Sequence, residues 1–226
     1  MNPKSDDKPE EHELRSYGRR RGRKPSARQS ALLRDDLPRL TFDPAAAPEG
    51  YRQTWLEIGF GGGEHLLWQA RHNPNVLLLG CEPFEDGVIK VLTAIADEDL
   101  KNVRLHMADA REIVRELHPD SIDRAFILFP DPWPKRKHRK RRLVNKSLLG
   151  LLADVMRSGA ELRIGTDIGD YARTMLEAFS LEPRFVWQAE SPDDWRVRPS
   201  DWPQTRYEAK AVREGRRRYY FRFLRA

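Results

Sequence analysis

A glycine-rich run with an acid at its start is the first feature of this sequence that could bind a ligand. The run extends from Glu57 to Gly63, reads EIGFGGG, and follows an apolar segment. Glycines at a strand-to-helix turn let the backbone approach a nucleotide closely. The dinucleotide fingerprint G-x-G-x-x-G does not fit, because its third glycine would fall on Glu64 or Leu66. The spacing E-x-G-x-G-x-G therefore argues against a nicotinamide-dependent oxidoreductase.

Three acids follow successive predicted strands of the chain. Glu82 follows the strand predicted over 75–80, a little over ~20 residues past the glycines, where an acid can accept hydrogen bonds from ribose hydroxyls. Asp109 follows the next, short strand. Asp131 follows the strand predicted over 122–129, and the prolines on both sides of it stiffen its loop. Because ligands bind at the carboxyl ends of parallel strands, we expect these acids to line one pocket with the glycines.

A strongly basic segment comes shortly after Asp131. It extends from Lys135 to Lys146 and contains eight Lys or Arg residues among twelve. Such a run is often only a solvated helix face, but this one adjoins the expected pocket, where an RNA substrate would need a cationic surface. We assign His138 to this run and not to a metal site, because no Cys or His cluster has the spacing of metal ligands. The sequence therefore predicts an RNA partner and no metal.

These motifs resemble those of a known family. The glycine spacing is similar to the cofactor loop of Rossmann-like methyltransferases that use S-adenosylmethionine. Residues 129–143 (FPDPWPKRKHRKRRL) closely resemble the signature of bacterial tRNA (guanine-N7)-methyltransferases. Residues 56–63 (LEIGFGGG) and 165–167 (GTD) look like that family's cofactor loop and fifth-strand end. Residues 205–208 (TRYE) resemble its T-K-F-E motif, with Arg for Lys and Tyr for Phe, and the whole resemblance covers roughly residues 40–226.

The resemblance implies a cofactor, a substrate and a set of site residues. The cofactor would be S-adenosylmethionine, and the acceptor would be N7 of the guanine at position 46, in the variable loop of tRNA. The implied cofactor-binding residues are Glu57, Gly59, Gly61, Gly63, Glu82, Asp109 and Asp131, and Asp131 is also the implied catalytic carboxylate. The implied substrate contacts are Lys135, Asp167, Thr205, Arg206, Tyr207 and Glu208. The implied RNA-contacting residues are Lys137, His138, Arg139, Lys140, Arg141 and Arg142.

Other interpretations remain open from the sequence. The chain could be another RNA-binding Rossmann-like methyltransferase, or a non-catalytic RNA-binding module, although the intact set of strand-end acids favours an enzyme. Asp167 could contact guanine or cap the helix that begins near Gly169. Cys81, beside Glu82, is interpreted as a packed core residue because methylation of guanine N7 needs no thiol nucleophile.

The elements that must position these residues alternate between strands and helices. This alternation predicts an α/β, Rossmann-like methyltransferase fold with a mostly parallel, doubly wound sheet. The last two strands lack a long helix between them, which predicts an antiparallel edge. Strands are predicted over 55–58, 75–80, 103–107, 122–129, 160–164, 185–188 and 219–223, and helices over 64–71, 85–96, 110–117, 143–156 and 170–179.

The composition fits one domain with a basic extension. The chain has 226 residues, of which 39% are hydrophobic and 34% charged, with a formal net charge of +6. Residues 1–35 have too few apolar side chains to order themselves, so we predict a disordered basic arm, either a solubilising tail or an RNA tether, ahead of a methyltransferase domain over 36–226. Cys81 is the single cysteine, and no apolar window approaches the ~18 residues of a membrane span. We expect a cytoplasmic protein without membrane association, either a monomer or a weak homodimer.

Overall fold

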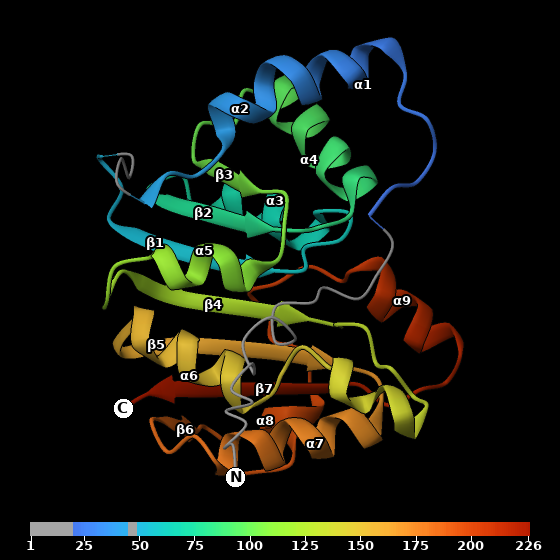
Figure 1. Cartoon of the computed structure of the whole chain (residues 1–226). Helices are drawn as coiled ribbons and strands as arrows, with labels where there is room; N and C mark the ends of the chain where they lie inside the picture. Colours follow the sequence, from blue (N-terminus) through green and yellow to red (C-terminus); the bar gives the residue numbers. More distant parts are fainter. Residues whose placement is uncertain (1–19, 45–48) are drawn as a thin grey trace, which may run out of the picture.

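The computed structural model describes residues 20–44 and 49–226, which form an α/β fold around one sheet (Figure 1). The sheet has seven strands in the order β3-β2-β1-β4-β5-β7-β6. β7 is antiparallel to both of its neighbours, and the other paired strands are parallel. The predicted fold class is therefore confirmed, with the antiparallel strand one place in from the edge. The strands are β1 (Gln53–Ile58), β2 (Val76–Cys81), β3 (Val103–His106), β4 (Ile122–Leu128), β5 (Met156–Thr166), β6 (Phe185–Trp187) and β7 (Tyr219–Arg225).

Helices cover both faces of the sheet. α3 (Glu64–His72) and α4 (Glu85–Glu98) pack on one face, and α5 (Ala110–Glu116), α6 (Lys146–Val155) and α7 (Gly169–Ser180) pack on the other. Alternate residues of one strand serve the two cores: Leu77 and Leu79 pack on the side of α5 to α7, and Leu78 packs on the side of α3 and α4. Burial on both faces explains why the central strands are nearly continuous apolar runs.

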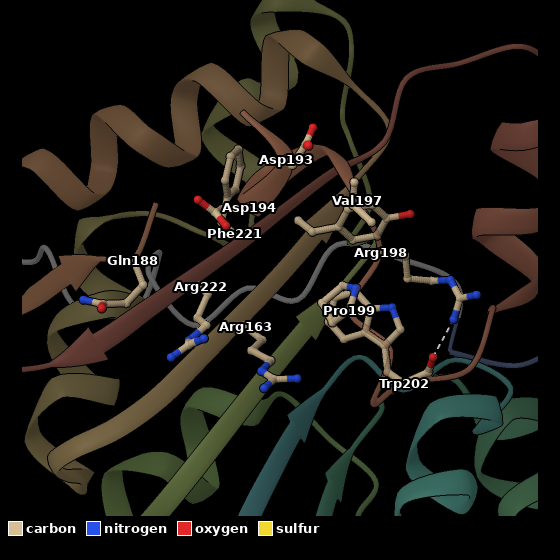
Figure 2. Close-up of a pocket in the computed structure, with 11 residues that line it drawn as sticks. Arg163, Gln188, Asp193, Asp194, Val197, Arg198, Pro199, Trp202, Phe221 and Arg222 are labelled. Carbon is tan, nitrogen blue, oxygen red and sulfur yellow. Dashed lines mark hydrogen bonds between the residues drawn. The ribbon is translucent and has the colours of Figure 1, made fainter. Parts of the chain in front are cut away.

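One part of the sheet is covered by an irregular segment in place of a long helix. Over β5 and β7, on the side of α3 and α4, lies the segment that follows α8 (Asp193–Arg196), in which Trp202 is buried. Figure 2 shows the pocket that these elements enclose, with Arg163 and Arg222 projecting from the strands. Arg163 forms an ion pair with Asp201 at 2.6 Å. Glu161 forms ion pairs with Arg163 and with Arg222. None of the predicted site residues lines this pocket.

The N-terminal part of the described chain is helical. α1 (Ala27–Ala31), the π-helical η1 (Leu32–Asp36) and α2 (Leu37–Leu40) follow one another, and Ser26 and Gln29 form a capping box at the start. Leu32 is buried against the core that contains α4, with further leucines packed around it. Residues 27–35, which were predicted to be part of a disordered arm, are therefore helical in the structure, and Leu32 anchors them to the domain. Residues 1–19 of the predicted arm lie outside the described residues.

The carboxyl ends of the parallel strands meet at one edge of the sheet, which we term the carboxyl edge. Ile58 pairs with Cys81 at the ends of β1 and β2, and Leu128 pairs with Gly165 near the ends of β4 and β5. The 3₁₀-helical η3 (Arg136–Arg141) and α9 (Arg206–Arg213) also lie at this edge (Figure 1). No helix in the described ranges, 20–44 and 49–226, is long and apolar enough to cross a membrane.

Candidate active site

Three glycines between β1 and α3 have backbone conformations that other residues rarely adopt. The φ angle is 74° at Gly59, 57° at Gly61 and 80° at Gly63. Alternating left-handed residues fold the chain tightly without Cβ strain, which accounts for the G-x-G-x-G spacing. A Cβ on Gly63 would also lie only 2.2 Å from Cγ2 of Val91 on α4. The three predicted glycines thus form one turn, the glycine turn, at the carboxyl edge.

Glu82 follows β2 and lies against the glycine turn. Its Oε2 accepts a hydrogen bond of 2.8 Å from the backbone N–H of Gly61, and its Oε1 accepts one of 2.9 Å from Phe84. Burial raises the pKa of Glu82; the two backbone hydrogen bonds oppose this effect, the charge of Asp131 adds to it, and Arg206 opposes it. The structure therefore brings Gly61, Glu82 and Arg206 together, and Asp131 lies near enough for its charge to act on Glu82.

Asp131 lies in a loop whose backbone is held in an unusual conformation. Phe129 and Trp133 have φ angles of 51° and 42°, although neither is a glycine. Each such residue costs about 1–3 kcal/mol, and the surrounding structure must hold it in place. The N–H of Phe129 donates a 2.7 Å hydrogen bond to the carbonyl of Gly165, and the Trp133 ring lies 4.9 Å from the Arg141 guanidinium. Asp131 itself is exposed at the surface, and partial desolvation of its carboxyl group by this fixed loop raises its pKa.

Asp109 follows β3 and caps the helix that comes after it, α5. Its carboxylate caps α5 by accepting a 3.0 Å hydrogen bond from the backbone N–H of Arg111, and it pairs with the Arg111 side chain at 2.7 Å. Burial disfavours the charged form, but the hydrogen bonds from Arg111 outweigh it and hold the pKa of Asp109 below its usual value. Burial, followed by the charges of Asp109 and Glu82, raises the pKa of Cys81. Cys81 is a buried thiol, as predicted for a core residue.

The T-R-Y-E motif begins α9, a helix that the sequence analysis did not predict. Thr205 caps the helix, and its hydroxyl accepts a hydrogen bond from the N–H of Glu208. Arg206 and Tyr207 lie on the glycine turn: a Cβ on Gly61 would be 3.2 Å from Cε2 of Tyr207. Glu208 is buried and accepts a 2.7 Å hydrogen bond from the Tyr220 hydroxyl, while its Oε2 atom has no partner among the described residues.

Comparison with known proteins identifies the family. A family model described as "Putative methyltransferase" matches residues 51–221. A tRNA (guanine-N(7)-)-methyltransferase from Hyphomonas neptunium is 46% identical over 206 residues, which cover 88% of this chain and 94% of that protein. The enzyme of the same name from Rhodospirillum rubrum is 43% identical over 97% of this chain and 90% of its own length. The chain belongs to the tRNA (guanine-N(7)-)-methyltransferase family. The resemblance predicted from the motifs is therefore confirmed.

Solved structures of more distant methyltransferases share the fold of this family member. A variant of the 16S rRNA (adenine(1408)-N(1))-methyltransferase from Catenulisporales acidiphilia, crystallised with the cosubstrate SAM, is 17% identical and superposes with a TM-score of 0.58 over 82% of this chain and 92% of that one. An antibiotic-related methyltransferase is 18% identical, with a TM-score of 0.55 over 77% of this chain and 87% of that one. At these identities the likeness concerns the fold alone.

The predicted RNA-contacting segment of this methyltransferase divides into an exposed and a buried part. Lys137, Arg139 and Lys140 are exposed on η3, together with the predicted substrate contact Lys135, and His138 and Arg141 are partly buried against Trp133. Partial desolvation, with the neighbouring cations, lowers the pKa of His138. Arg142 is only 4% exposed, which corrects its prediction as an RNA contact. Its guanidinium instead packs within the protein, over the ring of Tyr171.

Glu57 is the most buried of the acids predicted to bind the cofactor of this methyltransferase. It is 3% exposed, and its Oε2 lies 2.7 Å from Nδ1 of His65 on α3. The Nε2 atoms of His65 and Gln69 lie 3.1 Å apart, and Gln69 also donates to the carbonyl of Asp201. Glu57 thus begins a buried hydrogen-bond chain that runs from the glycine turn to the segment ahead of α9. His65 and Gln69 were not singled out from the sequence, and their i, i+4 spacing on α3 was the available signal.

Asp167 lies beyond β5, where the sequence placed it, and forms an ion pair there. Its Oδ2 is 2.7 Å from Nε of Arg216, in the turn after α9. Asp170, three residues later, pairs with Arg139 at 2.8 Å and with Arg142 at 2.6 Å. Neither Arg216 nor Asp170 was predicted as part of the site, because ion pairs between distant segments leave no local pattern. Within residues 20–44 and 49–226, no group of three or more Cys, His, Asp or Glu side chains has the geometry of a metal site.

Proposed function

We propose that this chain transfers the methyl group of S-adenosylmethionine to N7 of a guanine in tRNA, and that this guanine is the one at position 46, in the variable loop. The observation that carries the proposal is the hydrogen bond between Glu82 and Gly61 of the glycine turn, at a site where the charge of Asp131 acts on Glu82. The names of the relatives that share most of the chain support the same acceptor atom and the same class of RNA.

The charges at the carboxyl edge suit a cationic cofactor. The pKa values of Glu82 and Asp131 are both raised by burial, so their negative charge is incompletely compensated. S-adenosylmethionine carries a sulfonium and an ammonium group against one carboxylate, and its net positive charge would stabilise both acids. Glu82 and Asp109 are the acids that we expect to hold the adenosine part, as the family resemblance implies.

The protein has little covalent chemistry to perform in this reaction. When bound, S-adenosylmethionine supplies an electrophilic methyl group on a positively charged sulfur. Guanine N7 has an in-plane lone pair and no proton, so no general base is needed, and the tasks of the site are alignment and exclusion of water. The base gains positive charge as it is methylated, and the carboxylate of Asp131 can stabilise that charge by holding an N–H of the base. The fixed conformations of Phe129 and Trp133 keep this carboxylate in place without reorganisation.

The exposed cations of η3 are suited to the phosphates that surround the target base. Lys137, Arg139 and Lys140 lie on the surface just beyond the Asp131 loop. Lys or Arg contacts to phosphates release counterions and provide affinity that does not depend on base sequence. This affinity can offset the cost of unstacking the target base, which is about a few kcal/mol.

The test is incubation of the purified chain with methyl-labelled S-adenosylmethionine and an unmodified tRNA transcript. We expect label in the RNA, and nucleoside analysis of the digest should identify it as 7-methylguanosine. A matched transcript with adenine in place of the guanine at tRNA position 46 should stay unlabelled. Label in a different nucleoside would favour another RNA methyltransferase, and unlabelled RNA with tight tRNA binding would favour a non-catalytic binding module. Label that persists in the matched transcript would overturn the assignment of position 46.

A further inference from the structure

We propose that α9 and the turn after it form a second surface that contacts the tRNA backbone, through Lys210, Arg213 and Arg217. We term these three residues the α9 strip. The inference rests on the proposed function, since it takes tRNA as the substrate. It adds a binding surface outside the basic segment that the sequence analysis identified.

The charge of this part of the chain is strongly positive at its surface. Residues 206–218 contain six Arg or Lys residues and two glutamates. One of the two, Glu208, is buried against Tyr220, so its carboxylate does not face the surface. The other, Glu214, lies 3.9 Å from Lys210 and also pairs with Arg216. The surface therefore presents more cations than its own acids can neutralise.

Arg213 and Arg217 are exposed, and the described residues place no carboxylate beside either of them. In the described part of the chain, no acidic side chain lies within ion-pairing distance (4.0 Å) of Arg213 or Arg217, and both residues are exposed. The Lys210 side chain is 59% exposed. Guanidinium groups that are not already paired are well suited to bind phosphate oxygens through two parallel N–H donors. A polyanionic partner would therefore meet cations that do not first have to give up an ion pair.

The fold fixes the position of the strip at both of its ends. At the start of α9, Arg206 and Tyr207 lie on the glycine turn, with Cε2 of Tyr207 3.2 Å from the position of a Cβ on Gly61. At its end, the N–H groups of Gly215 and Arg216 donate to the carbonyls of Val212 and Ala211, which is the pattern of a Schellman motif. This turn brings Arg216 to Asp167, at 2.7 Å. The strip therefore extends from the glycine turn to the loop after β5.

The same loop also anchors the basic segment η3. Asp170, three residues after Asp167, pairs with Arg139 and with Arg142. Two basic elements that are far apart in sequence are thus fastened to neighbouring carboxylates, and both lie at the carboxyl edge, where Figure 1 shows α9 beyond the ends of the central strands. A tRNA is much larger than one nucleotide, so a tRNA whose base enters the site between these elements would pass over both. This placement favours the RNA backbone as the occupant of the strip.

The experiment compares two double variants of the full chain. Arg213→Ala with Arg217→Ala removes the two exposed arginines of the strip. The matched control is Arg52→Ala with Arg115→Ala, which removes two exposed arginines before β1 and at the end of α5, at the opposite edge of the sheet. For each protein, the Kd for an unmodified tRNA transcript is measured over a range of salt concentrations. Thermal unfolding and binding of S-adenosylmethionine alone show whether the fold and the cofactor site are intact.

We expect the strip variant to bind tRNA about 10-fold more weakly at low salt, with the slope of log Kd against log salt reduced by about 1.5, because ~0.7–0.9 is lost per phosphate contact. The control should keep the wild-type slope, and Arg213→Lys with Arg217→Lys should restore most of it. An unchanged Kd and slope in the strip variant, with the wild type still methylating tRNA, would overturn the α9 surface alone. A wild-type chain that neither binds nor methylates tRNA would instead overturn the proposed function.

Discussion

Arg142 and Asp170 form an ion pair that ties the Asp131 loop to α7. Nη2 of Arg142 lies 2.6 Å from Oδ2 of Asp170, and Nε of Arg142 donates a 3.0 Å hydrogen bond to the carbonyl of Pro132, next to Asp131. Nη1 adds a 2.8 Å bond to the Thr174 hydroxyl. The hydrogen bond from Arg142 is the main reason that the pKa of Asp170 is lowered. The guanidinium is therefore used inside the protein, at the base of the loop that carries the proposed catalytic carboxylate.

Replacing Arg142 should impair turnover and leave the electrostatics of RNA binding unchanged. We expect Arg142→Gln to lower kcat at least about tenfold and to lower the free energy of unfolding by about 2 kcal/mol, because Asp170 and the Pro132 carbonyl lose their donor. The slope of log Kd for tRNA against log salt should stay at the wild-type value. Arg142→Lys keeps the charge without the planar fork and should recover only part of kcat.

The control for Arg142 is Arg139, which pairs with the same Asp170 from the surface. Arg139→Gln should reduce the salt slope by about 0.7–0.9, as expected for one lost phosphate contact, and should leave kcat at saturating tRNA near the wild-type value. If Arg142→Gln reduced the slope while kcat stayed normal, Arg142 would be an RNA contact after all.

Neutralising Asp131 should abolish methylation without lowering stability. The raised pKa of Asp131 means that its carboxyl group binds a proton more tightly in the folded state than in the unfolded state. The folded state therefore loses stability as the pH rises from the unfolded-state pKa to the raised folded-state pKa. At neutral pH the whole of this loss is present. Asp131→Asn removes the penalty, and its Tm should equal or exceed that of the wild type. Asp123→Asn is the control, because the buried Asp123 accepts a 2.7 Å bond from the N–H of Thr54 and pairs with Arg157. Its Tm should fall. Near-normal turnover in Asp131→Asn would remove Asp131 from the mechanism.

The pH dependence of activity should reflect the titration of Glu82 and Asp131. The raised pKa values of Glu82 and Asp131 mean that both carboxylates take up protons at a higher pH than ordinary acids, so kcat/KM should fall on acidification before typical carboxylates titrate. The two sites interact, so the midpoint belongs to the pair. Arg206 opposes the rise at Glu82, and Arg206→Gln should therefore move the acid limb to higher pH. An acid limb that does not move would separate Arg206 from these carboxylates.

The sequence was sufficient for the features that depend on local pattern. The central strands are buried on both faces and therefore appear as continuous apolar runs, and the glycine spacing reflects three left-handed residues in one turn. Helix ends were less exact: the helix predicted over 143–156 begins at Lys146, because Asn145 caps it and accepts a hydrogen bond from the N–H of Leu148. β5 is longer than predicted because its polar start, before Ala160, still pairs with β4 at Met156.

What the sequence did not predict depends on contacts between distant segments. α9 is short and rich in charge, and its buried face consists mainly of Glu208 and Ala211, so it lacks the apolar periodicity by which a helix is recognised. Arg142 has the same residue type as its neighbours on η3, and only the packing of α7 shows that it is buried. The helices over residues 27–40 were missed because their few leucines stand among many charges and pack against the core that contains α4, which is distant in the sequence.

The buried pair of Glu57 and His65 should contribute strongly to stability. His65→Leu leaves a buried carboxylate without its hydrogen-bond donor, and we expect the free energy of unfolding to fall by about 3 kcal/mol in urea titrations. Glu57→Gln in the wild-type background should cost less, because the amide oxygen can still accept from Nδ1 of His65. In the double variant the two losses in the free energy of unfolding should be less than additive, because the carboxylate that His65 contacts has been replaced. Additive costs would show that the two side chains do not depend on each other.

Alanine substitutions in the glycine turn should separate backbone strain from steric overlap. Gly59 and Gly63 both have a left-handed φ, but a Cβ on Gly59 would meet no atom within 4 Å, whereas one on Gly63 would lie 2.2 Å from Val91. Gly59→Ala should therefore lower the free energy of unfolding by about 1 kcal/mol, and Gly63→Ala should lower it by about 3 kcal/mol or more. Gly159 is the control for strain alone, because its φ is 78° and the space around it is open. Gly159→Ala should match Gly59→Ala in stability and keep full methylation, while Gly59→Ala should weaken binding of S-adenosylmethionine. Equal costs at Gly59 and Gly63 would show that α4 can move away from the turn, and would contradict a rigid cofactor loop.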